Sequence, residues 1–391
     1  MIKRIFDIKK IPFAFNSLFC NGLVLSPSIF MRSGRQFAVK LLLKYLEIIW
    51  ISTIFVKKFH KNNSTVRQFL KTTTLLCLLL VCVAARAQDM NFTQFYAAPL
   101  YLNPALTGTT PHFRLSTLYR IQWPNLPGSY QVNAFAFDYN LDEYNSGLGL
   151  TASQDRAGAA GLRSTQFSAH YSYQINLTQS LIARAGLQAG FTSRSVDFSK
   201  LVFEDQLASG GPTREQLSGR SLNYLDFGTG LLIYNERFWF GASVFHLSRP
   251  SQGFIYGSER LAMRQSVHAG VKIPLDGGDG LVAISPSIAY HRQKPFDMLD
   301  FGVNFQYDPL FIGARYRGLP IRKNARGNVN QDAIAAVVGV KPGNFTFAYS
   351  YDFTISSLRG SGGSHEISII YEPKQDLRYK RGTKHIQCPA F

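Results

Sequence analysis

Charged residues and recognisable catalytic motifs are both scarce in this sequence. Asp, Glu, Lys and Arg make up 17% of the 391 residues, whereas 46% are hydrophobic and 14% are aromatic, which excludes a disordered chain and a coiled coil. The eight histidines form no H-x-x-x-H pair and no Cys/His cluster at metal-binding spacing. G-x-S-x-G and P-loop motifs are absent too. The sequence therefore predicts no catalytic site, no cofactor and no metal.

Acidic residues are scarcest at the beginning of the chain. The net charge of +18 would by itself suggest nucleic acid or an anionic surface as a partner. However, residues 1–87 hold 14 of the 42 Lys and Arg residues and only 2 of the 24 Asp and Glu residues. Residues 88–391 therefore carry only +6.

A secretory signal peptide is predicted over residues 66–87. Basic residues precede the apolar run 75–83, and an A-x-A pattern predicts cleavage between Ala87 and Gln88. The run is about half of the roughly 20 apolar residues that a spanning helix needs, so a membrane anchor is the weaker alternative. Nucleic acid is not expected as the partner of an exported chain.

The residues before this signal resemble no domain. Residues 1–65 lack a sustained period of 2 or 3.6, and a signal peptide normally begins a protein. We expect a misplaced translation start, with the true start close to Val66. The alternative is a genuine cytoplasmic or membrane extension.

Cysteine is also rare. Cys20, Cys77 and Cys82 precede the predicted cleavage site, which leaves Cys388 in the mature chain. No intramolecular disulfide is then possible. We expect Cys388 to be an inert thiol, with an intermolecular bridge as the alternative.

Alternating apolar and polar residues dominate from residue 113 onward. In 167–177, for example, the odd positions are apolar and the even positions are polar, which places them on opposite faces of a strand. Most such segments are longer than the five or six residues usual in soluble proteins, and tilted strands need roughly 9 to 11 residues to cross a bilayer. The fourteen predicted strands lie near 113–123, 129–141, 147–157, 162–177, 179–198, 222–234, 237–250, 264–275, 281–293, 298–307, 310–317, 331–342, 345–355 and 365–371.

Alternation alone does not distinguish a soluble β-sandwich or barrel from a membrane barrel, which is apolar outside. Long strands, polar faces rich in Ser, Asn, Gln and Gly, predicted export and an even strand count favour the membrane barrel. Aromatic strand ends such as Tyr173, Tyr307 and Tyr371 suit an interfacial girdle. We therefore predict an all-β fold, a transmembrane antiparallel outer-membrane β-barrel of about 14 strands over residues 113–371.

The connections predict the orientation of this barrel. The longest ones, 199–221, 251–263 and 318–330, all follow odd-numbered strands, as expected of outer loops, although three other odd connections are short. An even strand count then places both termini in the periplasm, with outer-membrane lipid around the barrel.

Two further segments are predicted outside the strands. Residues 88–112 form a periplasmic N-terminal segment that plugs the lumen, binds a partner or packs at the rim. Residues 372–391 form a basic periplasmic tail that is either solvated or an attachment point for a periplasmic partner or an acidic surface.

An enzyme is the third functional possibility. It would require Asp226, Asp300, Asp352 and His246 to meet at the lumen or rim. His170 and His268 lie on polar strand faces, where we expect a structural role.

Several different short motifs lie along the predicted exported part of the chain, residues 88–391. They are Q-D-x-x-F-T-Q-F-Y and P-L-Y-L-N-P-A-L-T-G within 88–108, D-F-G-T-G, F-G-A-S and H-L within 226–247, Y-S-Y-D-F-T and G-S-H-E-I within 349–367, and C-P-A-F at 388–391. Together they resemble the PorP/SprF family, outer-membrane proteins of the Bacteroidetes type IX secretion and gliding apparatus. The resemblance covers essentially all of residues 88–391.

The resemblance implies a noncatalytic barrel that anchors or routes exported cargo. Its partners would be periplasmic and outer-membrane components of the type IX machinery and, in gliding members, a surface adhesin. A passive porin or nutrient channel is the alternative function. The candidate partner-contact or family-motif residues are Phe95, Tyr101, Asn103, Pro104, Gly108, His246, Tyr351, Asp352, His365, Glu366, Cys388 and Phe391.

Overall fold

The structure is a computed structural model. It describes residues 89–389 except for 159–160, 198–200, 203, 212–220, 254–259, 278–280, 295, 324–328, 357 and 374–387. The expected extension 1–65, the signal peptide with Ala87 and Gln88, most of the tail and Phe391 lie outside the described residues.

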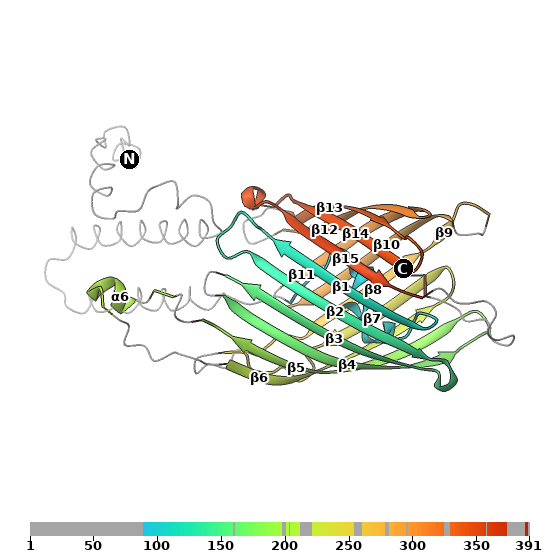
Figure 1. Cartoon of the computed structure of the whole chain (residues 1–391), viewed down its shortest axis with the longest axis horizontal. Helices are drawn as coiled ribbons and strands as arrows, with labels where there is room; N and C mark the ends of the chain where they lie inside the picture. Colours follow the sequence, from blue (N-terminus) through green and yellow to red (C-terminus); the bar gives the residue numbers. More distant parts are fainter. Residues whose placement is uncertain are drawn as a thin grey trace, which may run out of the picture. The chain divides into compact units, whose positions relative to one another are not determined.

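The strands form one antiparallel sheet that closes on itself (Figure 1). Each strand pairs with its neighbours in sequence, β1 pairs with β15, and β8 and β9 are consecutive pieces of one strand that pairs with β10. The result is a closed barrel of fourteen antiparallel strands, as predicted. The strands are β1 Phe113–Gln122, β2 Tyr130–Leu141, β3 Ser146–Ala157, β4 Leu162–Asn176, β5 Ile182–Ser195, β6 Ser221–Tyr234, β7 Phe238–Phe245, β8 Arg264–Val271, β9 Ile273–Pro274, β10 Val282–Gln293, β11 Phe296–Tyr307, β12 Leu310–Lys323, β13 Val329–Val340, β14 Phe345–Thr354 and β15 Ser364–Tyr371.

Two strand ends differ from the prediction by five residues or more. β7 ends at Phe245, short of the predicted residue 250, because His246 adopts a left-handed backbone conformation with φ of 61°. β12 continues past Arg317 to Lys323, because a bulge at Gly318 absorbs an irregularity in its pairing with β13.

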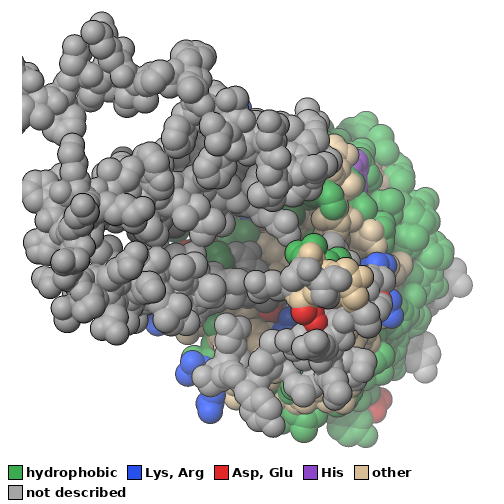
Figure 2. Space-filling view, turned by 90° about the vertical axis from the view of Figure 1, so that its left-hand side faces the viewer, with side chains coloured by type: hydrophobic (Ala, Val, Ile, Leu, Met, Phe, Trp, Pro, Cys, Tyr) green, Lys and Arg blue, Asp and Glu red, His purple; other side chains and the backbone are tan. Residues whose placement is uncertain are grey.

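The barrel is apolar outside and polar inside. Leu150, Leu187 and Leu231 are 57%, 60% and 63% exposed, whereas Arg120 and Asp138 on inward-facing positions are 1% exposed. Figure 2 shows hydrophobic side chains covering the side of the barrel. Because a soluble barrel would have the opposite arrangement, this distribution identifies the membrane barrel.

The connections differ between the two ends of the barrel. The longest, 196–220 and 246–263, lie at one end, here called the loop end; the first contains α6 (Glu204–Ser209). The other end, where β1 begins and β15 ends, is called the turn end and has short connections such as 142–145. Figure 1 shows α6 and β9 at opposite ends. The predicted long connection 318–330 shrinks to 324–328, since β12 extends.

Helices are few and short among the described residues. None of them is long and apolar enough to cross a membrane. Three lie in the N-terminal segment before the barrel, and the rest lie in connections. They are η2 Phe95–Ala97, α5 Pro99–Leu102, η3 Pro104–Leu106, η4 Asp142–Tyr144, α6 and η6 Arg359–Ser361.

Candidate functional site: the filled lumen

Residues 89–109, here called the plug, run through the barrel lumen. At the loop end the Asp89 amide donates to Gln293 Oε1, 3.1 Å away, at the last residue of β10. At the turn end the chain leaves the lumen at His112, whose carbonyl accepts from the Asn140 amide at 2.8 Å. Residues 88–112 were expected to plug the lumen, bind a partner or pack at the rim, and this path shows that they fill the lumen.

This path places the two ends of the described chain far from each other along the barrel. The strand ends Phe113 and Tyr371 do lie at the turn end, where Cys388 is also found. Asp89, however, lies at the loop end, because the plug crosses the lumen. The first and last described residues are therefore at opposite ends of the barrel.

Asn103 fixes the middle of the plug to the wall. Its Oδ1 accepts from the Ala105 amide at 2.9 Å and so caps η3, in which Pro104 takes the first position. Its Nδ2 lies 3.0 Å from the Leu231 carbonyl, 3.2 Å from the Ala242 carbonyl and 3.1 Å from His268 Nε2. One side chain thus joins the plug to β6, β7 and β8.

Glycines in the wall make room for this contact. A Cβ at Gly186 would lie 2.2 Å from the Ala105 nitrogen, and one at Gly230 would lie 1.9 Å from Asn103 Oδ1. Gly186 and Gly230 pair across β5 and β6. Because neither glycine has a side chain, the two together leave a recess in the wall that Asn103 and Ala105 occupy.

Glu366 holds the start of the plug through its backbone. Its carboxylate accepts from the amides of Thr93 at 2.9 Å and Gln94 at 2.7 Å. Gln94 Nε2 in turn donates to Ser350 Oγ at 3.2 Å, and Ser368 Oγ donates to Gln94 Oε1 at 2.5 Å. Glu366, Gln94 and Ser350 are all fully buried.

A cluster of buried ion pairs surrounds the same point. Arg120 binds Glu366 at 2.8 Å and Asp352 at 2.7 Å, and Arg317 binds Asp352 at 3.0 Å and Asp300 at 3.2 Å. Both arginines also donate to Thr93 Oγ1, at 2.9 and 3.1 Å. The plug, which is uncharged from Phe92 to Gly108, completes a network of buried charges in the wall.

A second buried pair holds the far end of the plug. Asp138 binds Arg114 at 2.9 Å and accepts from the Gly108 amide at 2.8 Å. Arg184 donates to the Gly108 carbonyl. Gly108 has a φ of +64° and passes within contact of the Gly147 backbone, so a side chain would be strained and obstructed there.

His246 holds the loop end of the plug. Its two ring nitrogens lie 2.6 Å from Asp89 and 2.6 Å from Asp226, and Arg264 lies 3.8 Å from Asp89. Burial works to lower the pKa of His246, but the two carboxylates outweigh it and raise the pKa to about 9. Burial also opposes ionisation of Asp89, yet His246 and Arg264 hold the pKa of that carboxyl well below its ordinary range. The pair is therefore ionised at neutral pH.

The other predicted motif residues do not belong to the polar clusters around Glu366, Asp138 and His246. Phe95 lies under the guanidinium of Arg315, 4.3 Å from its carbon, and the Tyr101 hydroxyl is bonded to β-strand carbonyls at 3.0 and 2.9 Å. The rings of Tyr351 and His365 lie 4.9 Å apart at a tilt of 56° near the loop end, and Cys388 is buried at the turn end.

Sequence reasoning missed most of the wall residues that hold the plug. Arg114, Arg120, Arg184, Arg317 and Asp138 belong to no motif that the resemblance supplied. A signal was present, however, because charged residues at inward positions of otherwise apolar strands require partners inside the lumen.

The residues considered for an enzyme do not form a catalytic arrangement. Asp226 and His246 are adjacent, but the second nitrogen of His246 binds Asp89 instead of a nucleophile. Asp300 and Asp352 are bridged by Arg317. Among the described residues, no group of three His, Cys, Asp or Glu side chains is placed to hold a metal ion.

The fold and its filled lumen define an outer-membrane β-barrel that holds its own N-terminal segment inside. Comparison with known families then places it. Residues 84–371 match the type IX secretion system membrane protein family PorP/SprF, and the chain belongs to this family.

Solved structures with a similar fold are other barrels. The toluene transporter TbuX of Ralstonia pickettii shares 12% identity over 70% of this chain and 91% of that chain, with a TM-score of 0.41. The outer membrane protein Omp33 of Acinetobacter baumannii shares 6% over 68% of this chain and 100% of that chain, with a TM-score of 0.39. No curated protein matches the chain.

Proposed function

We propose that this protein is a noncatalytic outer-membrane component of the type IX machinery that anchors or routes exported cargo, such as a surface adhesin. The observation that carries this proposal is the filled lumen. The plug is bonded to wall strands on several sides, through Glu366, Asn103 and Asp138 among others. A barrel built around a fixed internal segment is suited to be a support rather than an open passage.

The two ends of the barrel suggest a division of roles. Short connections are typical of the periplasmic side, so the turn end and the basic tail 372–391 would meet periplasmic components of the machinery. The long connections 196–220 and 246–263 would face outward and meet cargo. The signal peptide 66–87 would bring the chain to this location.

The test is export in cells that lack the protein. Surface and medium proteins are compared between the parent strain, the deletion strain and the strain complemented with the full-length gene. We expect a defined set of exported proteins to leave the cell surface on deletion and to return on complementation. An unchanged set of surface proteins would contradict the proposal.

A further inference from the structure

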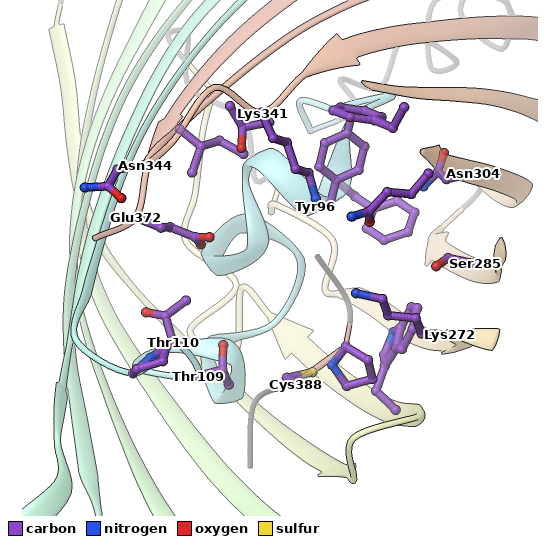
Figure 3. Close-up of a pocket in the computed structure, with 18 of the residues that line it drawn as sticks. Tyr96, Thr109, Thr110, Lys272, Ser285, Asn304, Lys341, Asn344, Glu372 and Cys388 are labelled. Atoms are coloured by element: carbon purple, nitrogen blue, oxygen red, sulfur yellow. The ribbon is translucent and has the colours of Figure 1, made fainter. Parts of the chain in front are cut away.

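A cavity remains in the lumen at the turn end, beyond the plug. Its volume is about 330 Å³, which lies in the range of small-molecule sites. Tyr96 and Thr109 of the plug form one part of its lining, Ser285 and Asn304 of the wall form another, and Cys388 closes it from the C-terminal side (Figure 3).

Three cations line this cavity. Lys341 and Lys272 reach toward the open space from different sides (Figure 3), and no carboxylate among the described residues lies within ion-pair distance of either. Arg315 is 3% exposed and reaches Asp300 only at 3.5 Å, while its Nε and Nη2 have no hydrogen-bond partner among the described residues. The described lining therefore holds three cations and one acid, Glu372, so it favours an anionic ligand.

Among the described ion pairs, Glu372 forms none with these three cations. Glu372 is 37% exposed and lies 3.8 Å from Arg114. Burial and the nearby charge of Lys272 lower the pKa of Lys341, and the charges of Glu372 and Asp308 do not offset them.

The rest of the lining is suited to an apolar body with a hydrogen-bond donor. The rings of Tyr96, Phe311 and Trp239 face the cavity, and Lys341 Nζ lies 5.5 Å from the centre of the Phe311 ring. The Asn304 side chain lines the cavity, and its amide can bond an N–H or O–H on a ligand.

We propose that this cavity is a binding site for an organic carboxylate that carries an aromatic or apolar body and an N–H or O–H donor. The carboxylate binds between Lys272, Lys341 and Arg315, the apolar body lies against Tyr96 and Phe311, and the donor bonds Asn304 Oδ1. Such a ligand is either a free small carboxylate or the C-terminal residue of a peptide. The site does not depend on the proposed role in secretion.

The test is calorimetric titration of the purified full-length barrel in detergent. The probes are N-acetylphenylalanine, which has a carboxylate, a ring and an N–H, and its neutral amide. We expect the acid to bind at least tenfold more tightly than the amide. Binding of both with equal affinity, or no binding of the acid up to 10 mM, would overturn the proposal; the ceiling follows from the roughly millimolar affinity that a few such contacts supply.

Variants locate the binding. Lys341→Met and Lys272→Met should each weaken binding of the acid about tenfold, whereas Lys294→Met, at an exposed lysine in the loop-end turn, should not. The Met variants should fold at least as well as the parent, because each removes a cation without an ion-pair partner. If they bind the acid as the parent does, the site is not in this cavity.

The source of the ligand is distinguished by a second pair of probes. A tetrapeptide ending in a free Phe carboxylate is compared with the same peptide amidated at its end. Tight binding of the peptide with the free carboxylate supports capture of a peptide C-terminus. If this peptide does not bind but N-acetylphenylalanine does, the ligand is a small molecule.

Discussion

Single buried side chains bond the plug to the wall of the lumen. Arg120, Arg317 and Arg315 face Asp300, Asp352 and Glu366, so three positive and three negative groups meet in the wall, with Thr93 of the plug between them. Removing one member leaves a buried charge without a partner.

Glu366→Gln tests this balance at nearly unchanged volume. It removes the charge that binds Arg120 and weakens the acceptor of two plug amides. We expect a loss of about 3 kcal/mol, seen as a lower temperature at which the folded band disappears on unboiled gels. The exposed Glu143→Gln is the control, and equal stability of the two variants would contradict the network's role.

Gly186→Ala tests the recess. The added methyl group would meet the plug backbone at Pro104 and Ala105, which has no flexible side chain to yield. We expect the barrel to fold with the plug displaced, so that Asn103 loses its contacts and the segment becomes sensitive to protease. Gly360→Ala, where a Cβ would have open space, is the matched control.

His246 predicts a pH limit on the loop end of the plug. Because its pKa rises from 6.5 to about 9, its stabilisation is complete below pH 6.5 and disappears as the pH rises through 9. The lowered pKa of Asp89 preserves the pair well below pH 4. The groups facing His246 are Asp89, Asp226 and Arg264.

Hydrogen exchange of the plug amides, followed from pH 6 to pH 10.5, measures this effect. We expect protection near Asp89 to fall above pH 9, by up to about 3 kcal/mol, since each pKa unit corresponds to about 1.4 kcal/mol. In His246→Asn the protection should be lower and independent of this transition. A transition of the same size in that variant would assign it to another group.

At the scale of elements, the strands were predictable and the plug's path was not. Alternation is local, so 167–177 by itself defines a strand with one apolar face. The position of residues 88–112 depends on contacts between segments more than a hundred residues apart, such as Asn103 with Leu231. The motif glycines 230 and 241 were visible in the sequence, but nothing local shows that Asn103 fills the space above them.

The strand pattern also predicts where charge is tolerated. Leu187 lies in the middle of β5 and is 60% exposed on the outer face, so Leu187→Arg would place a charge in the hydrocarbon core and cost about 2–4 kcal/mol. Leu207, 77% exposed in α6 at the loop end, gives the control Leu207→Arg. Refolding into lipid vesicles with urea titration measures both, and equal stability would contradict a lipid-facing Leu187.

At the scale of the whole molecule, ion conductance distinguishes the proposed support from a passive channel. A passive porin would show large, steady conductance in planar bilayers, whereas a barrel that holds residues 89–109 across its length should show little. Gly186→Ala is expected to raise the conductance, because it displaces the plug while leaving the wall intact, and Gly360→Ala is expected to leave it low. Large steady conductance of the unmodified barrel would favour the porin, and it would mean that the polar contacts at Asn103 and Glu366 do not hold the plug in a membrane.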